Sequence, residues 1–233
     1  MKAVIRRNKQ LVCDEIADLK PAEGQVLVKT LACGICGSDL HALHYMEHMI
    51  DLSRRAGGID NGFDPTADTV FGHEFCAEIL DHGPGSAKTL KAGTRVVSVP
   101  MTMNGMGVEL LGFSNRLPGG FAEQMLLTEA MVLPVPNGLP TDQAAMTEPF
   151  AVGLHAVAKA KLEPKSIALV IGCGPVGLAV IAALKAKGHG PVIAADFSPR
   201  RRAAAERLGA DIVIDPAKES PHDRWEGLGV PKS

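Results

Sequence analysis

The stretch that decides the fold is Ser166-Ile-Ala-Leu-Val-Ile-Gly172-Cys-Gly174-Pro-Val-Gly177. An apolar run of strand length leads into a G-x-G-x-x-G turn, and an apolar helix pattern begins inside that turn. In this context the first glycine makes a tight turn, the second lets the backbone approach a pyrophosphate, and the third lets the helix pack on the strand. The stretch therefore predicts a dinucleotide-binding unit with Gly172, Gly174 and Gly177 at the cofactor.

An acidic residue follows at the distance that this motif requires. Asp196 ends the next apolar run, 19 residues after Gly177, where a carboxylate would bind ribose hydroxyls and repel a 2′-phosphate. NAD is therefore expected rather than NADP, although three arginines at 200–202 could accommodate such a phosphate. A purely structural interpretation stays open, in which the glycines only pack and Asp196 only caps the next helix.

Around this motif, strand and helix patterns alternate. The expected strands are 166–171, 192–196 and 212–214, and the expected helices are 141–161 (with Thr141 as N-cap), 176–187 and 199–208. Alternation with apolar strands predicts a buried parallel sheet. A complete dinucleotide fold has two such halves. The chain supplies one, followed by a polar tail at 216–233, so the sheet is expected to be incomplete. Either the chain is a fragment or truncated, or the tail holds structure that its sequence does not indicate.

The first part of the chain has a different pattern, with short apolar runs between glycine- and proline-rich turns. This pattern predicts a barrel or sandwich with strands at 3–5, 25–31, 75–80, 95–99, 121–127 and 131–135. A helical pattern with Ser38 as its N-cap interrupts the strands and extends to Leu52. A loop is expected at 56–68 because this stretch is rich in glycine and aspartate.

Composition excludes several classes of function. The 233 residues carry a formal charge of −2 and only 4% aromatic side chains, so neither electrostatics nor stacking favours nucleic acid. The longest apolar stretch is broken by glycines and the first ten residues have no apolar core, so neither a membrane span nor a signal peptide is expected. Five cysteines, an odd count, indicate reduced thiols in the cytoplasm.

A second group of residues carries metal chemistry. Cys33-Gly-Ile-Cys36 is a single C-x-x-C pair, and Gly72-His73-Glu74 follows with its histidine 37 residues beyond Cys36. A thiolate, an imidazole and a carboxylate form a plausible catalytic zinc site with one open position. Ser38 and His41 lie three residues apart and could pass a proton from a zinc-bound alcohol to solvent. Each residue taken alone also has an ordinary structural interpretation, as a buried thiol, a helix cap or a surface histidine.

Taken together, these residues resemble the zinc-dependent medium-chain alcohol dehydrogenase family, and most closely its polyol (sorbitol) and threonine dehydrogenase branch. The matching motifs run in family order and are Cys36-Gly-Ser-Asp-Leu-His41, Gly72-His-Glu74, Pro118-Gly-Gly-Phe-Ala-Glu123, Glu148-Pro-Phe-Ala-Val-Gly-Leu-His155 and Gly172–Gly177 with Asp196. The resemblance implies a fold of class α/β plus β. A GroES-like β-barrel catalytic domain (1–150) would precede a partial Rossmann NAD-binding domain (151–233).

The resemblance also implies roles for individual residues. It implies hydride transfer between a secondary alcohol or polyol and NAD, with an alcohol or ketone as the small-molecule partner and a homo-oligomer for the full-length protein. Zinc would be held by Cys36, His73, Glu74 and Glu148, with Glu74 also a catalytic acid. Ser38 and His41 would be the proton relay, Val152 and Val176 would line the nicotinamide pocket, and Arg201 would accompany Asp196.

The sequence departs from the family in two internal stretches. The four closely spaced cysteines of a structural zinc lobe are absent from 98–116, so one zinc at most is expected. The segment 45–70 is longer than usual. It carries His48, Asp51, Asp60 and Asp64, with His44 just before it, and these residues would either shape the substrate pocket or lie on a solvated surface. Two alternatives stay open, a non-catalytic zinc- or nucleotide-binding fragment and a zinc-free quinone-type reductase. The candidate zinc ligands argue against the second.

Overall fold

The computed structural model describes residues 1–57, 63–104, 107–224 and 226–228, and it divides into two compact units. Met1–Glu148 forms a β-rich unit, and Pro149–Ser233 forms a unit in which strands and helices alternate. The fold class expected from the sequence, a β domain followed by a partial α/β domain, is confirmed. None of the helices in the described ranges has the length and apolar character needed to cross a membrane.

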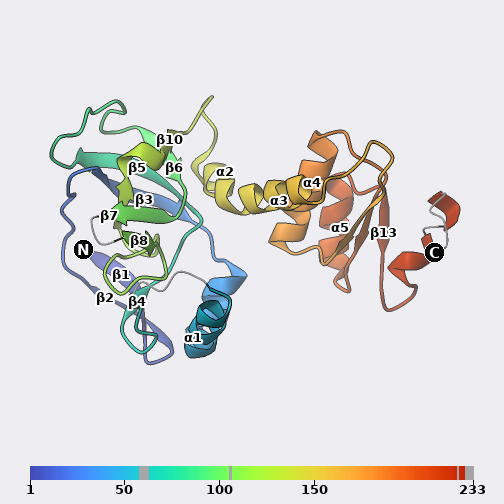
Figure 1. Ribbon diagram of the computed structural model, residues 1–233, viewed down its shortest axis with the longest axis horizontal. Helices are drawn as coiled ribbons and strands as arrows, with labels where there is room; N and C mark the ends of the chain where they lie inside the picture. Colours follow the sequence, from blue (N-terminus) through green and yellow to red (C-terminus); the bar gives the residue numbers. More distant parts are fainter. Residues whose placement is uncertain (58–62, 105–106, 225, 229–233) are drawn as a thin grey trace. The chain divides into compact units, whose positions relative to one another are not determined.

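The first unit is built from antiparallel sheets (Figure 1). One sheet has the order β2-β1-β4, another has the order β10-β6-β5-β3-β9, and β7 and β8 form a two-stranded ribbon. Apolar side chains of the five-stranded sheet, among them Val28, Ile79 and Leu127, form its main core. The strands are β1 (Lys2–Arg7), β2 (Gln10–Glu15), β3 (Gln25–Cys33), β4 (Thr69–Val70), β5 (Phe75–His82), β6 (Arg95–Ser98), β7 (Met101–Asn104), β8 (Gly107–Leu110), β9 (Gln124–Thr128) and β10 (Val132–Pro134).

Four of these strands were not predicted, for identifiable reasons. β2 is almost wholly exposed and therefore lacks an alternating apolar face. β4 has only two residues, and β7 and β8 lie in the methionine- and glycine-rich stretch that gave no strand pattern. The run expected as a strand at 131–135 is shorter, because Glu129–Met131 forms a 3₁₀ turn (η1) before β10.

The helix α1 (Gly37–Arg55) begins one residue earlier than its expected cap. Cys36 is the N-cap and Ser38 lies inside the first turn, so the prediction of Ser38 as cap was wrong. The Asp39 side chain accepts a hydrogen bond from the Cys36 backbone N–H at 2.9 Å, which fixes the start of the helix there. A kink at Tyr45 interrupts the helix, and its buried side chains pack against the unit through Ala42 and Met46.

The long helix expected at 141–161 is two helices, α2 (Thr141–Ala145) and α3 (Thr147–Lys159). Pro149 explains the break, because a proline inside a continuous helix would clash with the carbonyl group four residues earlier, that of Ala145. Pro140 occupies the N-cap of α2, so the expectation that Thr141 caps it was wrong.

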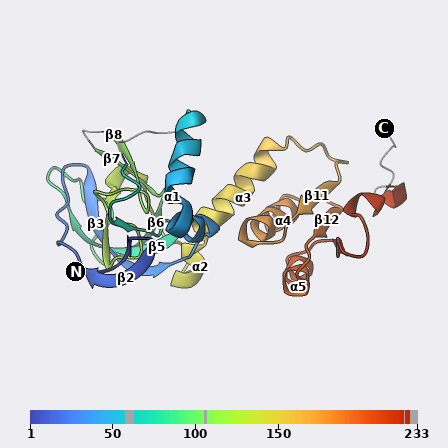
Figure 2. The same ribbon diagram turned by 90° about the horizontal axis from the view of Figure 1, so that it is seen from below.

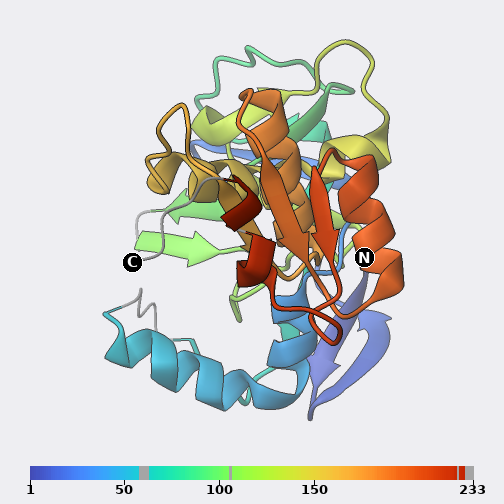
Figure 3. The same cartoon turned by 90° about the vertical axis from the view of Figure 1, so that its right-hand side faces the viewer.

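The second unit contains three parallel strands in the order β11-β12-β13, which can be followed in Figure 3 by their orange to red colours. They are β11 (Ala168–Ile171), β12 (Val192–Ala195) and β13 (Ile212–Ile214). The helices α4 (Pro175–Ala186) and α5 (Pro199–Arg207) pack on the strands and lie side by side (Figure 2). Short 3₁₀ turns, η2 (Pro221–Arg224) and η3 (Glu226–Leu228), follow β13.

Candidate functional site

Strand pairing brings three of the four expected metal ligands together. β3 and β5 run antiparallel, with Cys33 opposite Phe75 at the end of the pairing. Cys36 follows β3 after a short turn, and His73 and Glu74 directly precede β5. One ligand atom from each of Cys36, His73 and Glu74 lies within 4.8 Å of the others. Residues far apart in sequence therefore meet because the ladder places both strand ends at the same edge.

The buried carboxylate of Asp39 lies beside the imidazole of His73, and neither the facing Asp39 oxygen nor Nδ1 of His73 has a hydrogen-bond partner among the described residues. One Asp39 carboxylate oxygen lies 3.4 Å from Nδ1 of His73, and the other accepts the Cys36 N–H. The Asp39 side chain is 2% exposed and the His73 side chain 12% exposed. A carboxylate at Nδ1 leaves Nε2 as the nitrogen that could bind a metal, which is the arrangement common among metal-ligating histidines.

The donor set fits zinc. A thiolate sulfur, an imidazole nitrogen and a carboxylate oxygen are the ligand types of catalytic zinc sites, which leave a fourth position open. Burial lowers the pKa of His73, but the nearby Asp39 and Cys36 outweigh burial and raise the pKa to about 9. The surroundings of His73 therefore favour positive charge, which a divalent cation would supply.

Glu148, expected as a further ligand, lies in the first turn of α3. Burial raises the pKa of its carboxyl group, and its charge interacts with those of His73, Glu74 and Asp39. Among the described residues, however, the group of ligand atoms within 4.8 Å contains Cys36, His73 and Glu74 without Glu148. Its role as a direct ligand stays a prediction.

The expected proton relay lies on α1 directly after Cys36. Ser38 is half-buried and His41 is exposed, one turn further along the same helix. The rings of His41 and Tyr45 have centroids 5.1 Å apart. The order from half-buried hydroxyl to exposed imidazole suits proton transfer toward solvent, although no hydrogen bond joins the two side chains.

Cys33, the other cysteine of the C-x-x-C pair, has a different environment. Its sulfur packs against Gly72 and Gly120, where even a Cβ atom would be too close. Burial raises the pKa of its thiol to about 12, so the group is neutral at physiological pH. Cys33 is therefore a packed neutral thiol, in contrast to the ligand candidate Cys36.

The sequence reasoning missed Asp39, although a signal was present. Asp39 occupies the third position of a helix whose N-cap is the metal-ligand candidate Cys36. An acidic residue there accepts the N-cap backbone N–H, which brings its carboxylate back beside the ligand. The motif Cys36-Gly-Ser-Asp39 thus encodes both a helix start and a partner for His73.

The predicted dinucleotide turn joins β11 to α4 as expected. Gly172 has φ +91°, a conformation that favours glycine, and Gly174 is the N-cap of α4 with open space where a Cβ would lie. A Cβ on Gly177 would overlap the carbonyl oxygen of Gly172, so helix and turn touch there. Gly172 therefore makes the tight turn, and Gly174 leaves open space at the start of α4. Gly177 lets α4 pack closely against the turn.

Asp196 directly follows β12 and is 8% exposed. Its carboxylate accepts the backbone N–H groups of Ser198 at 2.7 Å and Cys173 at 2.8 Å. The Ser198 bond is the larger cause of the lowered pKa of Asp196, and the carboxylate lies 3.8 Å from Arg201. Ser198, not Asp196, is the N-cap of α5, so Asp196 has a separate role in holding the glycine turn.

The remaining expected cofactor residues are accessible in the second unit. Val152 on α3 is 43% exposed and Val176 on α4 is 44% exposed. Arg202 donates to the Asp196 carbonyl oxygen at 2.8 Å and pairs with Asp215 at 3.1 Å. Arg202 is thus engaged in the fold, which leaves Arg201 as the basic side chain beside the Asp196 carboxylate.

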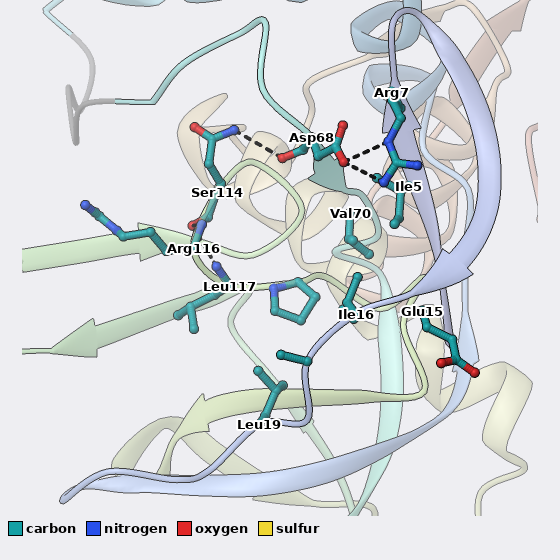
Figure 4. A pocket seen from close by; sticks show the side chains of 13 residues that line it. Ile5, Arg7, Glu15, Ile16, Leu19, Asp68, Val70, Ser114, Arg116 and Leu117 are labelled. Atoms are coloured by element: carbon teal, nitrogen blue, oxygen red, sulfur yellow. Dashed lines mark hydrogen bonds and ion pairs between the residues drawn. The ribbon is translucent and has the colours of Figure 1, made fainter. Parts of the chain in front are cut away.

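A separate pocket of about 430 Å³ lies in the first unit and contains none of the expected site residues (Figure 4). Apolar side chains such as Val70 and Leu117 line it together with charged ones. Arg7 is already paired with Asp68 at 2.8 Å and with Asp14 at 2.9 Å. The Arg7 side chain is therefore already engaged within the protein. The candidate site remains the cluster around His73.

Comparisons with known proteins identify the family. Residues 22–137 match the alcohol dehydrogenase GroES-like domain, and residues 175–231 match the zinc-binding dehydrogenase domain. The chain belongs to the zinc-dependent medium-chain alcohol dehydrogenase family, as the motifs indicated. Zinc and a nicotinamide dinucleotide are the cofactors of this family.

Individual relatives are polyol and diol dehydrogenases. The chain is 38% identical to (R,R)-butanediol dehydrogenase of Bacillus subtilis (strain 168) over 94% of its length, and 34% identical to sorbitol dehydrogenase of the same organism over 99%. It spans 64% and 69% of the length of these two relatives. The crystal structure of Bacillus subtilis 2R,3R-butanediol dehydrogenase superposes with a TM-score of 0.80 at 35% identity, covering 98% of this chain and 67% of that one.

Proposed function

We propose that this chain carries the zinc site and the dinucleotide site of an oxidoreductase that transfers a hydride between a secondary alcohol or polyol and NAD. The observation that carries the proposal is the convergence of the Cys36, His73 and Glu74 ligand atoms within 4.8 Å. The diol and polyol substrates in the names of the relatives support the substrate class.

In this proposal Cys36, His73 and Glu74 hold the metal, with Glu148, the second carboxylate, as a fourth candidate ligand. Bound zinc would act as a Lewis acid that lowers the pKa of an alcohol oxygen. Asp39 holds Nδ1 of His73 and so keeps Nε2 available. The Ser38 hydroxyl would accept the alcohol proton while passing its own proton toward His41, and the exposed His41 imidazole would release a proton to solvent.

The second unit supplies the cofactor site. Gly172, Gly174 and Gly177 place the N-terminus of α4 at the pyrophosphate, where backbone N–H groups and the helix dipole favour negative charge. Asp196 binds the ribose hydroxyls and selects NAD over NADP, with Arg201 beside it. The accessible side chains of Val152 and Val176 would line the nicotinamide pocket.

The proposal extends to partners and location. The partner is a small alcohol or its ketone, and the full-length protein forms a homo-oligomer. We place the protein in the cytoplasm, where reducing conditions keep thiols free, and the described residues hold five free cysteines.

The test is zinc per chain in protein purified without added metal, comparing wild type with Cys36→Ala. Cys13→Ala is the control, because Cys13 is an exposed cysteine in β2. About one zinc in wild type and Cys13→Ala, lost in Cys36→Ala, would support the site. A folded wild type without zinc would refute it in favour of a zinc-free reductase. Zinc and NADH binding without turnover of any alcohol would indicate a non-catalytic fragment.

A further inference from the structure

We infer that Gly34 is a positioning residue that makes room for the Glu74 carboxylate beside the metal ligands. This inference rests on the proposed metal site. Gly34 lies between β3 and Cys36, and its backbone N–H donates to the Glu74 carbonyl oxygen at 2.7 Å. The two residues therefore face each other where the β3–β5 ladder ends.

The space that Gly34 leaves open is filled by Glu74. A Cβ on residue 34 would collide with Oε2 of Glu74, and it would lie 3.1 Å from the Glu74 Cβ and 3.4 Å from Cδ. Facing residues in antiparallel strands usually have Cβ atoms about 4.5–5.5 Å apart. An alanine at position 34 would therefore crowd the side chain that carries the third ligand atom.

Backbone conformation does not explain this glycine. Gly34 is absent from the described glycines with positive φ, so an alanine could adopt its backbone angles. The nearest atom is the end of a flexible side chain, so the Glu74 carboxylate can rotate away, and the Glu74 Cβ at 3.1 Å then has to shift by only a few tenths of an ångström. The consequence is specific, because the carboxylate would leave its place near Cys36 and His73 while the backbone remains intact.

Gly37 provides a matched control in the same motif. It lies three residues after Gly34, at the start of α1, also without a positive φ and with no atom within 4 Å of a Cβ built there. The same change, glycine to alanine, is therefore made twice within Cys33-Gly-Ile-Cys-Gly37, once against the Glu74 carboxylate and once into open space.

The experiment measures zinc affinity by competition with a chromogenic chelator in the 233-residue chain. Gly34→Ala should weaken zinc binding by about 10–100-fold, the usual cost of disturbing a group that supports a metal site, and Gly37→Ala by less than about twofold. Thermal unfolding of the metal-free proteins should give similar midpoints for both variants, because the metal-free fold does not depend on the position of this carboxylate.

A double-mutant cycle separates action through Glu74 from general damage. In the Glu74→Ala background the carboxylate is gone, so adding Gly34→Ala should change zinc affinity by less than about twofold. An equal loss in both backgrounds, or no loss in Gly34→Ala alone, would overturn the inference. A wild type that binds no zinc would instead refute the proposed metal site, on which the inference depends.

Discussion

Replacing Asp39 with asparagine tests whether this buried carboxylate sets the state of His73. The asparagine oxygen can still accept the Cys36 N–H, now bonded at 2.9 Å. The asparagine NH₂ group would then face Nδ1 of His73, where the carboxylate oxygen lies at 3.4 Å. An NH₂ donor favours the tautomer in which Nδ1 accepts and Nε2 carries the proton. That tautomer cannot bind a metal through Nε2.

The expected result is a loss of zinc affinity of about 10–100-fold, which corresponds to about 1.4–2.7 kcal/mol. Both side chains keep nearly the same volume and the helix keeps its cap, so the metal-free fold should remain intact. Zinc affinity is measured by chelator competition, and the free energy of unfolding of the metal-free protein by urea titration.

Asp51→Asn is the control for this substitution. Asp51 is on the same helix, but it is half exposed and is paired with Arg55 at 2.9 Å. Its loss should cost less than about 1 kcal/mol of stability and leave zinc binding unchanged. Unchanged zinc affinity in Asp39→Asn would refute the orienting role of Asp39. An equal loss in Asp51→Asn would show a nonspecific charge effect instead.

Two further pairs of substitutions test the second unit and the packing. Gly177→Ala should destabilise the fold by about 1–3 kcal/mol in urea titration, because its Cβ overlaps Gly172. Gly174→Ala should change stability by no more than about 0.5 kcal/mol. It should weaken NADH binding, measured by fluorescence, because its Cβ would fill the open space. Equal stability losses in Gly174→Ala and Gly177→Ala would contradict the assigned glycine roles. Ile181→Ala, fully buried, should cost about 2–5 kcal/mol, whereas Ile35→Ala, 67% exposed, should cost less than about 0.5 kcal/mol. Similar losses would show that the core is assigned wrongly.

The parallel sheet of the second unit was predictable because its signals are local. β13 was predicted to the residue, and α4 and α5 to within about one residue. Their signals, which are apolar strands, a glycine turn and helix starts, follow one another directly along the chain. In the first unit, β2, β7 and β8 gave no such pattern. Their pairing depends on partners elsewhere in the chain, which residue periodicity does not report.

The candidate site was predictable in its residue types but not in its support. Cys36, His73 and Glu74 stand out because their side chains carry metal chemistry. Asp39 and Gly34 do not, since their roles depend on what they face. Asp39 on α1 faces the His73 imidazole, and Gly34 at the end of the β3–β5 ladder faces the Glu74 carboxylate; both neighbours are visible only in three dimensions.

The described charged and histidine side chains of the long segment at 45–70 are exposed, which is compatible with a solvated surface. His44, His48 and Asp51 are exposed residues of α1, so a solvated surface accounts for them. Asp64 is also exposed and accepts hydrogen bonds from Thr66, and Asp60 lies outside the described residues.

The same segment shows why its length need not disturb the candidate metal site. Cys36 and His73 adjoin the paired ends of β3 and β5, where Cys33 lies opposite Phe75. The segment leaves the ladder after Cys36 and returns before His73. The register of the ladder, and not the length of the intervening chain, determines which residues meet. The segment between Cys36 and His73 can therefore be longer while the ligand atoms remain within 4.8 Å of one another. The unusual spacing between the two ligands is therefore compatible with an ordinary arrangement of the site.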